Sequence, residues 1–305
     1  MVLLIIVGLI LFLFGFKKMG LGFKNVVSGH IKQLIKLFTD SHIKAIFFGT
    51  VITAIIQSSS SMTVIIISLL NENIIEITQA VGLILGANIG TTFTSYILIL
   101  NLDDLAPFIL LIGLVIKLVS KNFKTKAVGD ILLGLSFIVF GLNITKISLY
   151  PLRNSEFIGH MIEKFKFNPV LGVLSSLILT LIVQSSSATM GFLLALASEG
   201  LIDLKTGIPV ILGQNLGTCI TAFLASLFSN KNGKRAAAAH IIFNFIGIIW
   251  AIFLIKPLSD LINLIIKSRV EHQLVVFHTL FNIINVILFL PFLDYYIIFL
   301  KKTIR

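Results

Sequence analysis

The chain has 305 residues, of which 57% are hydrophobic and 12% are charged, about half the charged share that is usual in soluble proteins. Long apolar runs without period-two alternation predict a helical integral membrane protein rather than a β-barrel. The single cysteine, Cys219, excludes an intrachain disulfide and a cysteine-based metal site. The net charge of +11 fits the positive-inside bias of membrane proteins better than nucleic-acid binding, because no basic patch is interleaved with aromatic residues.

The N-terminal part of the chain predicts one crossing helix and then a surface segment. Val2–Phe16 is apolar, and Lys17, Lys18 and Lys24 follow it rather than precede it. A secretory signal carries its positive charges before the apolar stretch, so we expect a retained helix whose N-terminus lies outside. Lys24–Phe38 mixes basic and apolar residues at helical spacing, which predicts a helix on the cytoplasmic surface.

The segment His42–Leu70 contains a polar stretch, Gln57-Ser58-Ser59-Ser60-Ser61. Consecutive hydroxyl and amide side chains are costly in hydrocarbon unless they are buried in protein or face a cavity. As a re-entrant hairpin, the segment has a 15-residue arm, His42–Ile56, and a 10-residue arm, Ser61–Leu70. Neither arm is long enough to cross the bilayer alone, so we predict a hairpin rather than one span.

Glu76–Leu100 is the next predicted span, and its middle reads Gly86-Ala87-Asn88-Ile89-Gly90-Thr91-Thr92. Glycine and asparagine weaken a helix interior, and a break here would free backbone groups to face a ligand. The alternative is close helix packing through small residues. We expect a broken helix.

The remaining segments follow in the order crossing, crossing, surface helix, hairpin, broken span, crossing and crossing. Their predicted bounds are Leu105–Val119, Ala127–Ser148, Phe157–Phe167, Pro169–Ser198, Thr206–Phe228, Ala236–Ile255 and Gln273–Leu300. The second hairpin carries Gln184–Ser187 at its tip, and the second break is expected at Gly213–Thr218.

The two halves of the chain align at a constant offset of 127 residues, which indicates a duplication. The matched pairs include Thr53 with Thr180, Gln57–Ser60 with Gln184–Ser187, Asn88 with Asn215, and Thr91 with Thr218. We expect a single domain, 1–305, with one repeat at about 1–120, a second at about 127–255 and an extra C-terminal helix at about 272–300.

An odd number of crossings separates the two hairpins, so the second repeat enters the membrane from the opposite side, as in many secondary transporters. With seven crossings in all, 16 of the 24 Lys and Arg residues fall on one side and 8 on the other. The positive-inside rule then places the N-terminus outside and the C-terminus in the cytoplasm. The predicted fold class is an all-α polytopic membrane protein with two inverted repeats, each with a re-entrant helical hairpin and a broken transmembrane helix.

The polar tips predict an anion site. Helix N-termini carry unpaired amides and roughly +0.5 charge. Four are expected near the midplane, at the second arms of the two hairpins and the second halves of the two broken spans, and together they would bind a compact oxyanion without a buried Lys or Arg. Freed carbonyls and threonine hydroxyls would hold a hard cation such as Na⁺ through neutral oxygens.

Each QSSS cluster is followed, 31 residues after its Gln, by the Asn of a G-x-N-x-G-T segment. This pairing resembles the type II sodium–phosphate cotransporter family, from about Leu9 to about Phe289, and takes in Phe14-Gly15, Phe140-Gly141 and two His-x-x-Phe-Asn segments, His240–Asn244 and His278–Asn282. The resemblance implies that both QSSS regions are re-entrant and line the path of sodium and phosphate. Many bacterial members carry a PhoU-like domain after the transporter, and none is expected in this chain.

We therefore expect a sodium-coupled inorganic phosphate symporter in the cytoplasmic membrane, with Na⁺ as the coupling ion, no organic cofactor, no enzymatic activity and no nucleic-acid partner. A homodimer is left open. The expected phosphate-binding residues are Gln57, Ser58, Ser59, Ser60, Asn88, Gln184, Ser185, Ser186, Ser187 and Asn215. The expected sodium-binding residues are Thr53, Thr91, Thr92, Thr180 and Thr218.

Other functions remain open at this point. Within the transporter class they are transport of another small anion, such as sulfate or a dicarboxylate, and phosphate export. An anion channel is a further alternative, because broken helices occur in channels too. An intramembrane serine hydrolase would use a Ser of Gln57–Ser61 with His240 or His278 as its base. It would not explain the second cluster, and a capping or bridging role suits each histidine better.

Overall fold

The computed structural model describes residues 2–27, 35 and 39–304. Within these residues every regular element is a helix, which confirms the all-α class. Six helices are long and apolar enough to cross a membrane, and the number rises to seven if α8 and α9 count as one bent span. The six are α1 (Val2–Val27), α5 (Ile77–Leu98), α7 (Phe123–Leu149), α11 (Leu204–Ser226), α12 (Lys231–Phe253) and α14 (Val270–Phe289).

The first helix is longer than predicted. It runs for 26 residues, so Lys17, Lys18 and Lys24 lie within it, and the predicted end at Phe16 is wrong. The reason is the partner helix: α1 packs along α7 through glycines, and a Cβ atom at Gly15 would lie 2.6 Å from the Ile138 amide nitrogen. Most of the expected surface segment Lys24–Phe38 lies outside the described residues.

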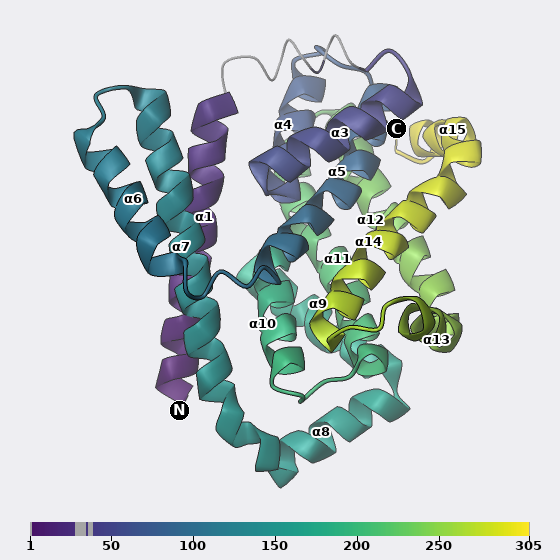
Figure 1. The fold of residues 1–305 in the computed structure, drawn as a ribbon. Helices are drawn as coiled ribbons and strands as arrows, with labels where there is room; N and C mark the ends of the chain where they lie inside the picture. The colour runs from purple at the N-terminus through teal and green to yellow at the C-terminus, as the bar shows by residue number, and fades with distance from the viewer. Residues whose placement is uncertain (1, 28–34, 36–38, 305) are drawn as a thin grey trace.

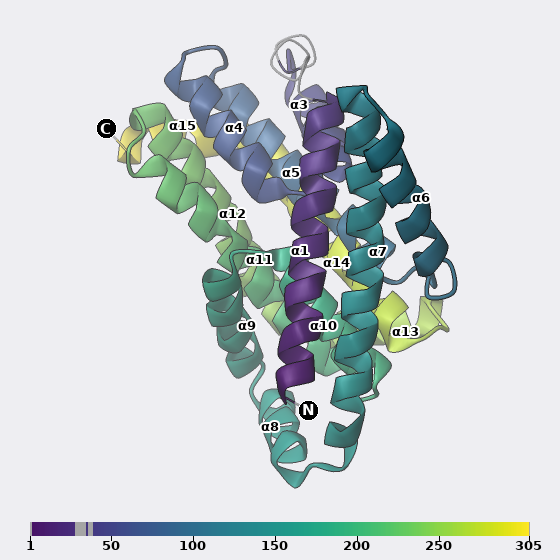
Figure 2. The same cartoon turned by 90° about the vertical axis from the view of Figure 1, so that its left-hand side faces the viewer.

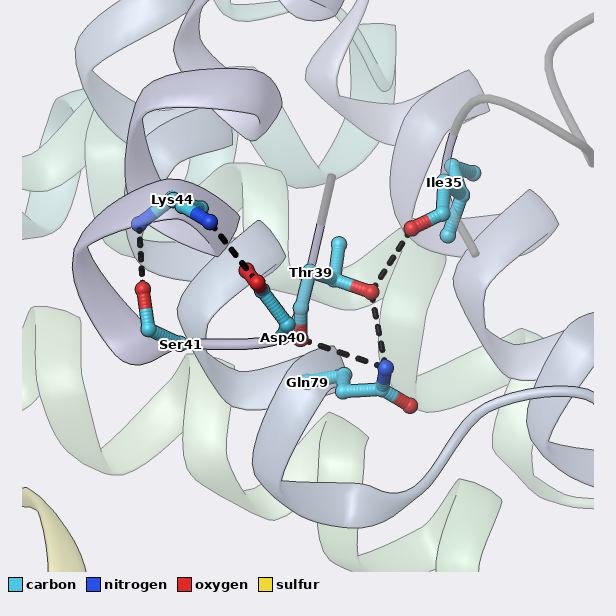
Figure 3. Close-up of polar contacts among 6 residues, drawn as sticks. All are labelled: Ile35, Thr39, Asp40, Ser41, Lys44 and Gln79. Atoms are coloured by element: carbon cyan, nitrogen blue, oxygen red, sulfur yellow. Dashed lines mark hydrogen bonds and ion pairs between the residues drawn. The ribbon is translucent and has the colours of Figure 1, made fainter. Parts of the chain in front are cut away.

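The first hairpin is confirmed as two short helices, α3 (His42–Ile56) and α4 (Ser59–Asn71), of 15 and 13 residues. Its base is tied to α5, because the Gln79 amide donates to Thr39 Oγ1 at 2.8 Å. On the other side of the loop Lys44 pairs with Asp40 at 2.7 Å (Figure 3).

The second hairpin has the same form, with α9 (Pro169–Val183) and α10 (Ser186–Ser198). The amphipathic helix α8 (Glu156–Phe167) precedes it, and α8 is bent by 114° from α9. This bend gives α8 the direction expected of a helix on the membrane surface.

The expected breaks in the two long helices are wrong. Helix α5 runs without interruption through Gly86–Thr92, and α11 through Gly213–Thr218. Their glycines serve close packing instead, and the same contacts occur in both repeats. A Cβ at Gly86 would lie 2.8 Å from both the Ile46 carbonyl carbon and the Thr50 nitrogen. A Cβ at Gly213 would lie 2.9 Å from the carbonyl carbon of Val173 and 3.0 Å from the nitrogen of Leu177, which are the matched residues.

The other elements complete the path. Helix α6 (Ala106–Val119) has 14 residues, fewer than the six long helices, and it packs along α7 with most of its apolar surface exposed. After α7 comes the 3-10 helix η1 (Tyr150–Asn154), and after α12 comes α13 (Ile255–Ile265). The last predicted span consists of α14, η2 (Leu290–Phe292) and α15 (Leu293–Thr303).

The two hairpins lie in opposite halves of the molecule. Figure 2 shows α3 and α4 in the upper half and α9 and α10 in the lower half, while α1, α6 and α7 stand together at one side in Figure 1. The N-terminus and C-terminus lie at opposite ends (Figures 1 and 2). This arrangement is the one that inverted repeats produce.

Candidate functional site

The tips of the two hairpins, far apart in the sequence, line one cavity of about 660 Å³. Helix α1 forms another side of it. The lining residues from the tips are Ile56, Gln57, Ser58, Ser59, Ser60, Ser61, Val183, Gln184, Ser185, Ser186 and Ser187. Helix α5 adds Thr91, and helix α1 adds Leu13, Phe16, Lys17, Gly20, Leu21 and Lys24.

A glutamine with a positive φ angle ends the first helix at each hairpin tip. Gln57 has φ 59° and Gln184 has φ 56°, so each ends its first helix in the left-handed conformation that is typical of a helix C-terminus. The next residue is an N-cap: Ser58 Oγ accepts from the Ser61 amide at 3.1 Å, and Ser185 Oγ accepts from the Ala188 amide at 3.3 Å. Helices α4 and α10 therefore both begin at the cavity.

This geometry suits an anion. The first amides of a helix have no partner within the helix, and the helix dipole adds partial positive charge at the same end. Two such ends meet at the cavity, with serine hydroxyls beside them. Ser58 and Ser185 are engaged as caps, and Ser61 Oγ accepts from Ser58 Oγ, which leaves Ser59, Ser60, Ser186 and Ser187 as the other serines of the cavity. A compact oxyanion is the ligand class that these donors fit.

The two tips are not equivalent. Gln57 is buried, with 8% of its surface exposed, whereas Gln184 is exposed. The Gln57 amide nitrogen donates to the Ala54 carbonyl, and its Oε1 atom has no partner within the described residues. Ser61 also differs from its counterpart Ala188, since Ser58 Oγ donates to Ser61 Oγ at 3.0 Å. The two halves therefore offer a ligand different groups.

Asn88 and Asn215, expected at the phosphate site, do not line this cavity. Both are buried in contacts with the His-x-x-Phe-Asn helices. Asn88 Nδ2 donates to the Ile84 carbonyl at 2.9 Å, and Asn88 Oδ1 accepts from Asn244 Nδ2 at 3.3 Å. Asn215 Oδ1 lies 3.2 Å from His278 Nε2, and His278 Nδ1 lies 3.1 Å from Ser95 Oγ. His278 on α14 thus connects α11 with α5.

Of the five expected sodium-binding threonines, Thr91 lines the cavity and the others do not. Three of those four bond within their own repeat: Thr92 Oγ1 donates to Ile89 O at 2.7 Å, Thr218 Oγ1 to Gln214 O at 2.8 Å, and Thr180 Oγ1 lies 2.9 Å from Thr189 Oγ1. Thr53 Oγ1 is buried without a partner in the described part of the chain.

The sequence pattern predicts no contribution of α1 to the site. It treats Lys17 and Lys24 as charges that follow a short helix, but both line the cavity. Their spacing of seven residues, with Gly20 between them, places them on one side of a helix. This spacing was the available signal, and it has meaning only once the helix is known to extend past Phe16.

Comparison with known proteins identifies the family of the chain. The model of the Na+/Pi-cotransporter family matches residues 11–146 and 153–293. The chain belongs to this family. It is a multi-pass membrane protein of a transporter family, and its membership supports phosphate transport.

The chain covers different shares of the lengths of its relatives. It is 29% identical to the "Uncharacterized protein YqeW" of Bacillus subtilis over 93% of the chain and 92% of that protein. It is 24% identical to the "Putative inorganic phosphate export protein YjbB" of Salmonella typhimurium over 93% of the chain but only 52% of YjbB. It is 32% identical to the mouse "Sodium-dependent phosphate transport protein 2A" over 44% of the chain and 22% of that protein. No solved structure matches the chain.

Proposed function

We propose that the protein is a secondary active transporter that carries inorganic phosphate together with Na⁺ across the cytoplasmic membrane. The observation that supports this most is the cavity shared by the two QSSS tips, which is lined by the beginnings of two helices and by their serine residues. These groups suit a phosphate oxyanion. The phosphate and sodium named for protein 2A supply the substrate and the coupling ion of the proposal.

Within this proposal Ser59, Ser60, Ser186 and Ser187 donate hydrogen bonds to phosphate, and the amides that begin α4 and α10 supply the positive ends of two dipoles. Gln57 Oε1 and the threonine hydroxyls are neutral oxygens of the kind that suits Na⁺.

Phosphate export is the second candidate, because YjbB, related over 93% of this chain, carries that description in its name. The same site serves both directions, since gradients decide the direction of net flux. A serine hydrolase is disfavoured, because the described residues that line the cavity include no histidine. His278, one of the two histidines that this alternative would use as its base, bonds instead to Ser95 and Asn215.

Flux in proteoliposomes tests the proposal. We expect phosphate uptake that requires an inward Na⁺ gradient and ignores a matched K⁺ gradient. Uptake driven by a pH gradient without Na⁺ would refute sodium coupling. Flux that follows only the phosphate gradient would favour a channel, and sulfate transport without phosphate transport would reassign the substrate.

A further inference from the structure

The side of α1 that faces the cavity carries two lysines without an ionic partner. Lys17 and Lys24 both line the cavity and are exposed. Within the part of the chain that the structure describes, neither forms an ion pair, and no Asp or Glu lines the cavity. The charge on this surface is therefore of one sign.

The neighbouring lysine has a different role. Lys18 points to α7, where its Nζ lies 2.9 Å from a carboxylate oxygen of Asp130, and Lys117 of α6 also contacts that carboxylate. Because successive residues of an α-helix are rotated by about 100° around its axis, Lys17 and Lys18 lie on different sides of α1. Lys18 thus connects three helices through Asp130, while Lys17 lines the cavity.

Helix α1 also comes close to the first tip. A Cβ atom at Gly20, between the two cavity lysines, would lie 3.8 Å from the Ile56 carbonyl oxygen. Ile56 is the last residue of α3, one residue before Gln57. Lys17 and Lys24 therefore flank the point where α1 passes the QSSS turn.

We propose that Lys17 and Lys24 form an oxyanion-capture site that draws phosphate into the cavity and favours anions of higher charge. This inference rests on the proposed function, because the captured anion is the transported phosphate. The tips supply only neutral donors and partial charges, whereas each lysine supplies a full charge. Clefts lined by one sign of charge raise the local concentration of the opposite ion by roughly 10- to 1000-fold, and salt reduces the effect.

The test compares Lys17→Gln, Lys24→Gln and the double variant with Lys18→Gln, which removes the same charge from the adjacent position. In proteoliposomes we expect the double variant to raise the half-saturating phosphate concentration about tenfold, with a smaller change for each single variant. Affinity should become less sensitive to ionic strength, and half-saturation by Na⁺ should not change. Lys18→Gln should keep the phosphate affinity, and Lys17→Arg with Lys24→Arg should restore it.

The proposal is overturned if the double variant keeps its phosphate affinity and its salt dependence, or if Lys18→Gln weakens phosphate equally. Failure of the wild-type protein to transport phosphate would instead refute the proposed function. A second measurement does not depend on transport: Lys17→Cys in a Cys219→Ala background, treated with anionic and cationic thiol reagents. The anionic reagent should react faster, and Lys24→Gln should remove that preference. Equal rates with Lys24 present would overturn the capture site.

Discussion

The substitution Gly86→Ala decides between two readings of the glycines in α5. If the helix were broken or loosely packed there, alanine would stabilise it by about 1 kcal/mol, because alanine is the better helix former. In the structure the added Cβ would lie 2.8 Å from the Ile46 carbonyl carbon and from the Thr50 nitrogen. These are backbone atoms, which cannot rotate away as a side chain can. The helices α3 and α5 would have to separate.

Overpacking of this kind costs roughly 1–3 kcal/mol. Because the clash is with backbone, we take the upper end and subtract the propensity gain of about 1 kcal/mol, which leaves a net loss of about 2 kcal/mol. The measurement is the free energy of unfolding in mixed detergent micelles. Gly213→Ala should lose a similar amount, because the matched contacts recur at Val173 and Leu177.

The matched control is Gly159→Ala in α8, where no neighbouring atom of the described residues lies within 4 Å of the added Cβ. It should be neutral or stabilise the protein by up to about 1 kcal/mol. If Gly86→Ala stabilised the protein as much as Gly159→Ala, the packing account would be wrong.

Two further predictions concern the tips and the buried histidines. Ser58→Ala removes the cap of α4 and should lower the free energy of unfolding by about 1 kcal/mol. Ser59→Ala should leave stability unchanged and weaken phosphate affinity roughly 10- to 150-fold, as expected for the loss of a hydrogen bond of about 1.5–3 kcal/mol to a charged group. Unfolding and uptake measurements on both variants separate the two effects. His278→Leu should destabilise the protein by about 1–3 kcal/mol, because Ser95 and Asn215 lose a buried partner. His240→Leu should cost less in the same unfolding assay, since His240 Nδ1 has no partner among the described residues.

The hairpin tips could be predicted from sequence because polar residues interrupt an apolar membrane segment at two places in the chain. Four polar residues inside an apolar stretch must face protein or a cavity, and the repeat at an offset of 127 excludes an accident. The inference needed no knowledge of distant contacts. The structure adds that both tips line the same cavity, which the local pattern could not state.

The glycines of α5 could not be assigned from sequence, because a break and a close helix contact require the same residues. What decides is the backbone of Ile46, which lies 40 residues earlier in the chain. The end of α1 had the same difficulty. In the sequence Lys18 is one of the lysines that follow the first apolar stretch, and its partner Asp130 lies on another helix. Pairing across distant segments is not contained in local composition.

Thr53 shows how the duplicated halves diverge, and it carries the last prediction. Its counterpart Thr180 has a hydroxyl partner, Thr189, at 2.9 Å. The residue matched to Thr189 is Met62, so Thr53 Oγ1 is buried and unpaired within the described chain. An unpaired buried hydroxyl costs about 1–3 kcal/mol. Thr53→Val should therefore leave the sodium-free protein as stable as the wild type or more stable, whereas Thr180→Val should lose about 1 kcal/mol.

The unpaired oxygen is accounted for if Thr53 Oγ1 binds Na⁺ in the working protein. A ligand that binds only the folded state stabilises it, by about 2.7 kcal/mol at a hundredfold excess over the dissociation constant. Thr53→Val should lose most of this sodium-dependent gain and keep its stability in K⁺. The measurement is the unfolding midpoint in NaCl and in KCl at equal ionic strength. A variant that gains as much stability from NaCl as the wild type would remove Thr53 from the sodium site.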